Sequence, residues 1–301
     1  MSLQGAWSNP VVVGTSDGAV NPYVEKIKEH SPLFVLANEF AGGEWKDESG
    51  NDRHFINVGS SLVTSGGPGP SLTHYVDLDG VDDYLELAHE AALTLSNPAT
   101  IVLWVWVASD ASPSHTHACA LSKGGSDYEV RHPGDISSIS FAPEASSSAN
   151  ESLQHGEWVA VIAWNRVDDS TLIRVRPASS GSWSQTIAGA QPFGTATNPL
   201  RIGGRGSGDR HFDGRVAGVA ILPGADLSLE EHDAIFDAAF EEPEELGDAY
   251  LIFRRTPPTG EPFDPEVDTP IATVPSNQLT YDDEGIGEAE YEYQVFARKV
   301  D

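Results

Sequence analysis

The sequence has little of several residue types on which stability or chemistry often depends. Cys119 is the only cysteine among 301 residues, so no disulfide can form within the chain. Only five lysines occur, at Lys26, Lys28, Lys46, Lys123 and Lys299. No apolar run approaches the ~20 residues that a membrane-spanning helix needs. A basic, then apolar, secretion signal is also missing, so we expect synthesis in a cytoplasm without an export signal.

Positive charge is scarce throughout. Asp and Glu total 46 against 17 Lys and Arg, which gives a formal net charge of −29. Such a surface repels nucleic acids and anionic membranes, so we expect no nucleic-acid partner and no membrane insertion. One interpretation is a solvated acidic surface that aids solubility. We favour adaptation to high salt, which screens self-repulsion; melting temperature should then fall when the salt concentration is lowered.

Short apolar runs punctuated by turn residues predict an all-β fold. Glycine (29) and proline (20) are plentiful, as expected where tight turns join many strands. The run Ile101–Val107 is apolar throughout, which predicts a central strand. This spacing favours an antiparallel jelly-roll sandwich. Further strands are expected at Leu33–Leu36, Ala118–Leu121, Ile136–Phe141, Trp158–Trp164, Leu172–Val175, Leu200–Gly203 and Phe212–Leu222.

Four segments are expected along the chain: an N-terminal arm (1–21), a jelly roll (22–241), an acidic linker (242–249) and a small β-module (250–301). Asn21-Pro22 predicts the start of a helix through Lys28, and Ser228 with Glu231 forms a capping box before a second helix.

The small module is expected to be incomplete, because a small open sheet is marginal alone. Alternating residues before Arg298 are similar to the late strands of a fibronectin type III sandwich, with Tyr291 in a tyrosine-corner position. We expect the arm, the jelly roll or another subunit to complete it.

The most informative stretch is Tyr75–Leu87. Asp79-Gly80 favours a tight turn between two half-buried strands, because glycine tolerates positive φ and aspartate caps its own backbone. Taken alone, the stretch predicts a β-hairpin.

The same stretch resembles a family signature. Asp79-Gly-Val-Asp-Asp-Tyr84 is similar to the "D-G-x-D-D-Y" of laminin G-like jelly rolls, which are concanavalin A-like sandwiches. Further resembling pieces follow in the family's order, at 100–106, 156–160, 200–204, 212–216 and 226–231. The resemblance implies a domain that mostly binds and seldom catalyses. Ala217-Gly218 stand where the family often has Asp-Glu.

A calcium site is one candidate. Asp47, Asn51 and Asp52 offer hard oxygen ligands within one loop, and the family's topology implies that Asp213 approaches them. The alternative is an Asx-rich turn, because the spacing does not follow an EF-hand loop.

A glycan-binding site is the second candidate. Arg205, Arg210 and His211 are basic groups on an acidic chain, and with Trp183 they would contact a sugar or its acidic substituents. The alternative is a solvated loop with a Trp that caps the core.

Two other patterns favour ordinary loops. His115–Cys119 lacks a fourth zinc ligand, and Gly203–Gly208 lacks the ending of a phosphate-binding loop.

Related sandwiches that hydrolyse glycans carry "E-x-D-x-E" on one strand, and no such run occurs here. We therefore expect a non-enzymatic protein. The missing export signal and the incomplete β-module favour a place on a virion surface (tail, fibre or capsid exterior), where the protein would bind host glycans or neighbouring subunits as a homo-oligomer. The alternatives are a purely architectural capsid decoration or turret subunit, and a glycan-cleaving enzyme.

Overall fold

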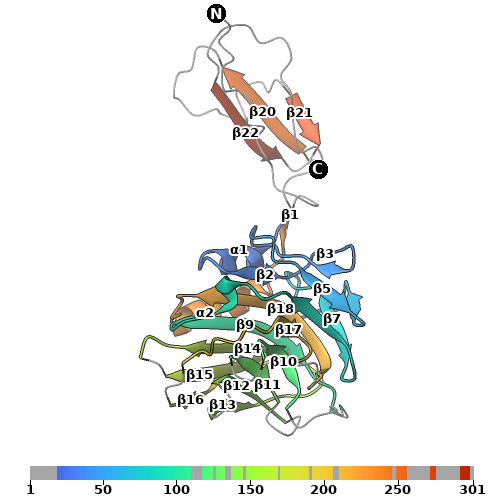
Figure 1. The fold of residues 1–301 in the computed structure, drawn as a ribbon. Helices are drawn as coiled ribbons and strands as arrows, with labels where there is room; N and C mark the ends of the chain where they lie inside the picture. Colours follow the sequence, from blue (N-terminus) through green and yellow to red (C-terminus); the bar gives the residue numbers. More distant parts are fainter. Residues whose placement is uncertain are drawn as a thin grey trace, which may run out of the picture. The chain divides into compact units, whose positions relative to one another are not determined.

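A computed structural model gives the fold (Figure 1), and it describes residues 19–109, 111, 117–124, 127–132, 137–144, 147–168, 170–189, 192–205, 210–245, 249–255, 272–275 and 292–298. The chain divides into two compact units. One spans 22–242, and the other groups 1–21 with 243–301.

The larger unit is built on two antiparallel sheets (Figure 1). Sheet A has nine strands in the order β13-β12-β11-β10-β17-β8-β5-β4-β3. Their bounds are β3 (Phe40–Ala41), β4 (Glu44–Trp45), β5 (Phe55–Val58), β8 (Tyr84–Leu87), β10 (Cys119–Ser122), β11 (Glu129–Arg131), β12 (Ser138–Glu144), β13 (Ser147–Ser152) and β17 (Leu200–Ile202).

Sheet B has eight strands in the order β16-β15-β14-β9-β18-β7-β6, with β2 paired to β18. Their bounds are β2 (Phe34–Leu36), β6 (Ser61–Val63), β7 (Tyr75–Asp79), β9 (Ala99–Trp106), β14 (Trp158–Asn165), β15 (Thr171–Pro177), β16 (Ser184–Ala188) and β18 (Asp213–Pro223). The two stacked sheets confirm the expected jelly-roll sandwich, and β9 is the central strand that its apolar run predicted.

The main core lies between the sheets, where Val105 and Val161 of sheet B join Leu85, Val130 and Ile202 of sheet A in one apolar cluster. Since side chains alternate along a strand, the neighbours of these residues point to the outer faces.

A second apolar cluster covers the outer face of sheet B. There Trp104 and Ala160 pack against Tyr23 and Ile27 of helix α1 (Pro22–Lys28) and Phe236 of helix α2 (Leu229–Ala238). Both helices begin where the sequence predicts, and α2 carries the predicted capping box. A short 3₁₀ helix, η1, spans Ala91–Leu93. Neither α-helix is long and apolar enough to cross a membrane, nor is any other described helix.

The predicted hairpin at Asp79-Gly80 is wrong. Strand β7 pairs with β6 and β18 in sheet B, whereas β8 pairs with β5 and β17 in sheet A, so the turn carries the chain from one sheet to the other. Leu78 and Leu85 enter the same core from opposite sheets. An apolar alternation is satisfied equally by a hairpin and by such an arch, so the pattern could not distinguish them.

In the smaller unit, β1 (Ala19–Val20) pairs with β19 (Glu244–Glu245), which joins the end of the arm to the acidic linker. A three-stranded sheet has the order β21-β20-β22, with β20 at Ala249–Arg255, β21 at Ala272–Pro275 and β22 at Glu292–Arg298. Three strands do not define a fibronectin type III sandwich, so that assignment stays a prediction. Tyr291 and the apolar run Val11–Val13 lie outside the described residues.

Candidate functional site

In the loop predicted to bind calcium, the polar side chains form hydrogen bonds with backbone groups of the loop and of the segment that leads into β2. Asp47 is buried; its Oδ1 accepts from the amides of Val35 (3.0 Å) and Ser49 (2.9 Å), and its Oδ2 accepts from the amide of Arg53 (3.0 Å). The exposed Asn51 donates from its side-chain amide to the carbonyls of Pro32 (3.0 Å) and Leu33 (3.2 Å). These contacts hold the loop against β2, as an Asx-rich turn would.

Asp213 does not approach that loop. It begins β18 opposite Asp79 of β7, whereas Asp47 binds Val35, whose strand partner is Ala220. Seven residues separate positions 213 and 220 on one strand, which is about 23 Å at ~3.3 Å per residue. The expected grouping of Asp213 with Asp47, Asn51 and Asp52 is therefore wrong, and Asp52 is an exposed residue at φ 58°.

Asp213 instead borders an aspartate loop, defined here as Asp79, Asp82 and Asp83. One carboxylate oxygen from each lies within 4.8 Å of the others. Burial raises the pKa of Asp83, and the neighbouring Asp79 and Asp82 add to the rise. Three carboxylates are the hard oxygen donors that calcium prefers, so this exposed triad could hold a metal ion with water completing the shell.

The basic residues singled out in the sequence lie on the connection from β17 of sheet A to β18 of sheet B. Arg205 follows β17, and Arg210 and His211 precede β18. The Nε of Arg205 lies 2.9 Å from Oε1 of Glu129, and the nearest approach of Arg210 to that carboxylate is 3.6 Å. Arg131 donates to it at 2.5 Å. We call Arg131, Arg205 and Arg210 around Glu129 the arginine cluster.

This cluster continues a row of polar residues across sheet A. Cross-strand partners run from Glu86 to Arg201, from Arg201 to Ser122, and from Ser122 to Glu129. Partners in register point to the same face, and this is the outer face because Leu85 and Ile202 fill the core.

Arg201 connects the row to an aromatic side chain. It donates to Glu86 at 2.7 Å, and its guanidinium lies 4.1 Å from the ring centre of Tyr84. The ring centre of His211 lies 6.3 Å from that of Tyr84. Sequence reasoning found Arg205, Arg210 and His211 but missed Tyr84, Glu129, Arg131 and Arg201, whose only signal was polar–apolar alternation within short strands.

Trp183 lies elsewhere. Its Nε1 donates to Asp233 of α2 at 2.5 Å, and its ring packs against Phe236 and under the guanidinium of Arg174 at 4.6 Å. These contacts place Trp183 on the outer face of sheet B, where it belongs to the packing of α2. The expected combination of Trp183 with Arg205, Arg210 and His211 is therefore wrong, because the last three lie against Glu129 and Tyr84 of sheet A.

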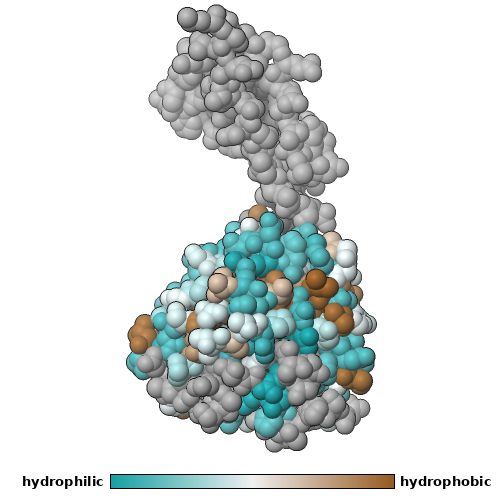
Figure 2. Space-filling view, viewed as in Figure 1, coloured by the Kyte–Doolittle hydropathy of each residue, from teal (hydrophilic) through white to brown (hydrophobic). Residues whose placement is uncertain are grey.

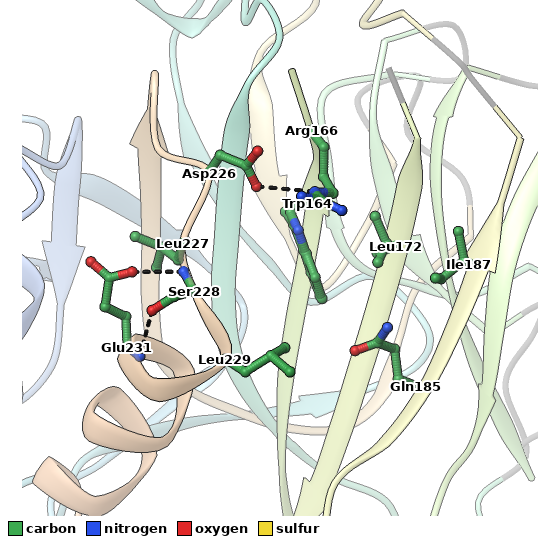
Figure 3. Close-up of a pocket in the computed structure, with 10 residues that line it drawn as sticks. All are labelled: Trp164, Arg166, Leu172, Gln185, Ile187, Asp226, Leu227, Ser228, Leu229 and Glu231. Carbon is green, nitrogen blue, oxygen red and sulfur yellow. Dashed lines mark hydrogen bonds and ion pairs between the residues drawn. The ribbon is translucent and has the colours of Figure 1, made fainter. Parts of the chain in front are cut away.

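A groove of about 440 Å³ opens at the start of α2 (Figure 3), which we call the α2 groove. Its walls are apolar, with Trp164, Leu172, Ile187 and Leu229. Figure 3 shows the Trp164 indole between Leu229 and Leu172, with the Arg166–Asp226 ion pair at one end.

Most polar groups of the α2 groove are already engaged. Arg166 pairs with Asp226 at 3.3 Å, and Ser228 and Glu231 cap each other reciprocally. Among the described residues, the side-chain amide of Gln185 and the Nε1 of Trp164 are the polar groups of the lining that have no hydrogen-bond partner. The surface in Figure 2 is mainly hydrophilic with small separate apolar patches, so the visible face carries no broad apolar area.

Comparison with known proteins agrees with this fold. No curated protein matches the chain. Among solved structures, a mutant of HCR/D aligns with a TM-score of 0.52 and 12% identity, over 76% of this chain and 59% of that chain. A mutant of Trypanosoma rangeli sialidase that displays trans-sialidase activity aligns with a TM-score of 0.50 and 15% identity, over 75% of this chain and 37% of that one.

The aligned part is thus about three fifths of the first of these structures, and similarity at such identity shows the fold alone. A family model described as the Concanavalin A-like lectin/glucanases superfamily matches residues 79–231, which begin at the aspartate loop and end in α2. The chain belongs to the concanavalin A-like lectin/glucanase superfamily.

Proposed function

We propose that this chain is a non-enzymatic, lectin-like protein that binds a glycan over the outer face of sheet A. The observation that carries the proposal is the row from Glu86 through Arg201 to Glu129, with Tyr84 beside it. Both described α-helices pack on sheet B, so no described helix covers this row. Ser122 and Glu129 are buried within it, and the partly exposed side chains that face solvent are Tyr84, Glu86 and Arg201.

The chemistry of the row suits a sugar. Carboxylate and guanidinium groups accept from and donate to hydroxyls, and an aromatic ring offers an apolar surface to the C–H face of a pyranose. The α2 groove is a poorer candidate, because its ion pair and helix cap are already satisfied, which leaves the amide of Gln185 and the buried Nε1 of Trp164 to recognise hydroxyls.

The spacing of carboxylates supports binding over hydrolysis. Glu86 and Glu129 are three strand-to-strand steps apart, which is about 14 Å at ~4.8 Å per step. Glycosidases hold their two carboxyl groups about 5 to 9.5 Å apart. Each of these glutamates is also engaged in an ion pair with an arginine.

A glycan array in 1 M and 0.15 M NaCl tests the proposal. We expect discrete positive glycans, lost in Tyr84→Ala and Arg201→Gln and retained in Gln185→Ala, which alters the α2 groove. An empty array with a folded, oligomeric protein would support the purely architectural alternative. New reducing ends on incubation with envelope polysaccharides would instead support a glycan-cleaving enzyme.

The proposed setting is the outside of a virus particle of a salt-loving host, on a tail, fibre or capsid surface, as a homo-oligomer. What supports it is the net charge of −29 together with the presence of a second β-unit in the same chain. An antibody against the chain should label intact particles; labelling of cells alone would contradict this setting.

A further inference from the structure

The arginine cluster holds more positive charge than the protein around it neutralises. Three guanidinium groups surround one carboxylate, that of Glu129, whose side chain is 3% exposed. Among the described residues, the side chains of Arg205 and Arg210 make no other ion pair and donate no hydrogen bond. The Nε of Arg131 is buried without a hydrogen-bond partner, and the Nε of Arg205 meets only the Glu129 carboxylate, in the 2.9 Å ion pair.

We propose that the arginine cluster binds the anionic group of an acidic glycan, either the carboxylate of a uronic or sialic acid or a sulfate ester. This inference rests on the proposed glycan-binding function and names the class of ligand. Excess positive charge is costly here, because the side chains of Arg131, Arg205 and Arg210 are only 12%, 19% and 23% exposed. An anion would supply the missing counter-charge.

The geometry favours an oxyanion over a hydroxyl. Planar guanidinium forks match the oxygens of a carboxylate or sulfate and bind them with paired, charge-assisted hydrogen bonds. The field of the cluster also reaches its neighbours: burial lowers the pKa of His117, and Arg131, Arg210 and Arg205 lower it further. The position beside Arg201 places the anion next to the polar row, where the sugar ring would lie.

Because the rest of the chain is acidic, the affinity for an acidic glycan should depend on salt in an unusual way. A net charge of −29 repels a polyanion at long range, whereas the cluster attracts it at short range. Salt shortens the Debye length from about 10 Å at 0.1 M to about 3 Å at 1 M, which removes the repulsion first. Affinity should therefore rise with salt before it falls, while an ordinary basic patch would weaken throughout.

The test is calorimetric titration with oligogalacturonate, its carboxyl-reduced neutral counterpart, and dextran sulfate with neutral dextran, from 0.1 to 2 M NaCl. We expect at least tenfold tighter binding of an acidic ligand than of its neutral counterpart. Preference for oligogalacturonate assigns the carboxylate, and preference for dextran sulfate assigns the sulfate. Arg205→Gln/Arg210→Gln should remove that preference.

The matched control is Lys26→Gln/Lys28→Gln. This variant also removes two positive charges, but from α1, and should leave binding unchanged. If the arginine variant does not fold, Arg210→Lys keeps the charge but loses the fork and should still weaken binding several-fold. Equal binding of acidic and neutral glycans, or equal losses in both double variants, would overturn the anion site but leave glycan binding standing. Binding of no glycan, here and on the array, would overturn both.

Discussion

Glu129 of β11 and Arg205, which follows β17, form a 2.9 Å ion pair whose carboxylate is almost fully buried. Strands β11 and β17 do not neighbour each other in sheet A, because β10 stands between them. This contact anchors the connection between β17 and β18 to the face of sheet A.

Glu129→Gln should be strongly destabilising. It leaves three mostly buried guanidinium groups without a counter-charge, and breaking a buried pair costs about 3 to 5 kcal/mol. Glu86→Gln is the matched change. The side chain of Glu86, which pairs with Arg201, is 34% exposed, and exposed ion pairs contribute about 0 to 1 kcal/mol. Urea unfolding measures both. Equal losses would show that the arginine cluster does not depend on Glu129.

Calcium should raise the melting temperature through the aspartate loop. Asp83→Asn and Asp82→Asn should abolish the calcium-dependent shift, because each removes one of three clustered carboxylates. Asp47→Asn should lower the melting temperature itself but keep the shift, since that carboxylate accepts three backbone amides. Differential scanning calorimetry with calcium or with a chelator measures the shift in each variant. If Asp47→Asn alone lost the shift, the calcium site would lie in the Asp47 loop, as the sequence predicted.

His232 should make the protein less stable in acid. Burial, together with the charge of the neighbouring Arg174 3.0 Å away, lowers its pKa to about 3. Between its ordinary value near 6.5 and about 3, the unfolded chain binds a proton that the folded chain does not. This contribution to stability is therefore present above about pH 6.5 and is lost progressively as the pH falls toward 3.

The measurement is the free energy of unfolding from pH 7 to 4 for the natural protein and for His232→Gln, which cannot titrate. The variant should be less stable at pH 7, and the difference should shrink in acid by up to about 1.4 kcal/mol per pH unit. A constant difference would mean that His232 protonates equally in both states.

Gly80→Ala should destabilise the crossing between sheets. Gly80 has φ +74°, and an added Cβ would lie 2.7 Å from the Cβ of Asp213. Gly43→Ala is the control, with φ +80° and nothing within 4 Å. Left-handed strain costs about 1 to 2 kcal/mol in both, so a larger loss of unfolding free energy is expected for Gly80. Equal losses would show that the contact with Asp213 relaxes freely.

Local patterns predicted local structure well. The Pro22 start of α1, the Ser228 cap of α2 and the central strand β9 were all predicted from nearby residues, since caps and continuous apolar runs act over a few positions. The short strand β11 was not predicted, because three residues carry too little periodicity.

The sequence by itself determined the fold class, the acidic surface and the basic character of the stretch from Arg205 to His211. Only the tertiary structure decided that β7 and β8 enter opposite sheets, that Asp213 borders Asp79, and that Trp183 packs on α2 while Arg205 and Arg210 meet Glu129. The reason is that pairing between distant strands sets which side chains become neighbours, and alternation along a strand is compatible with many pairings.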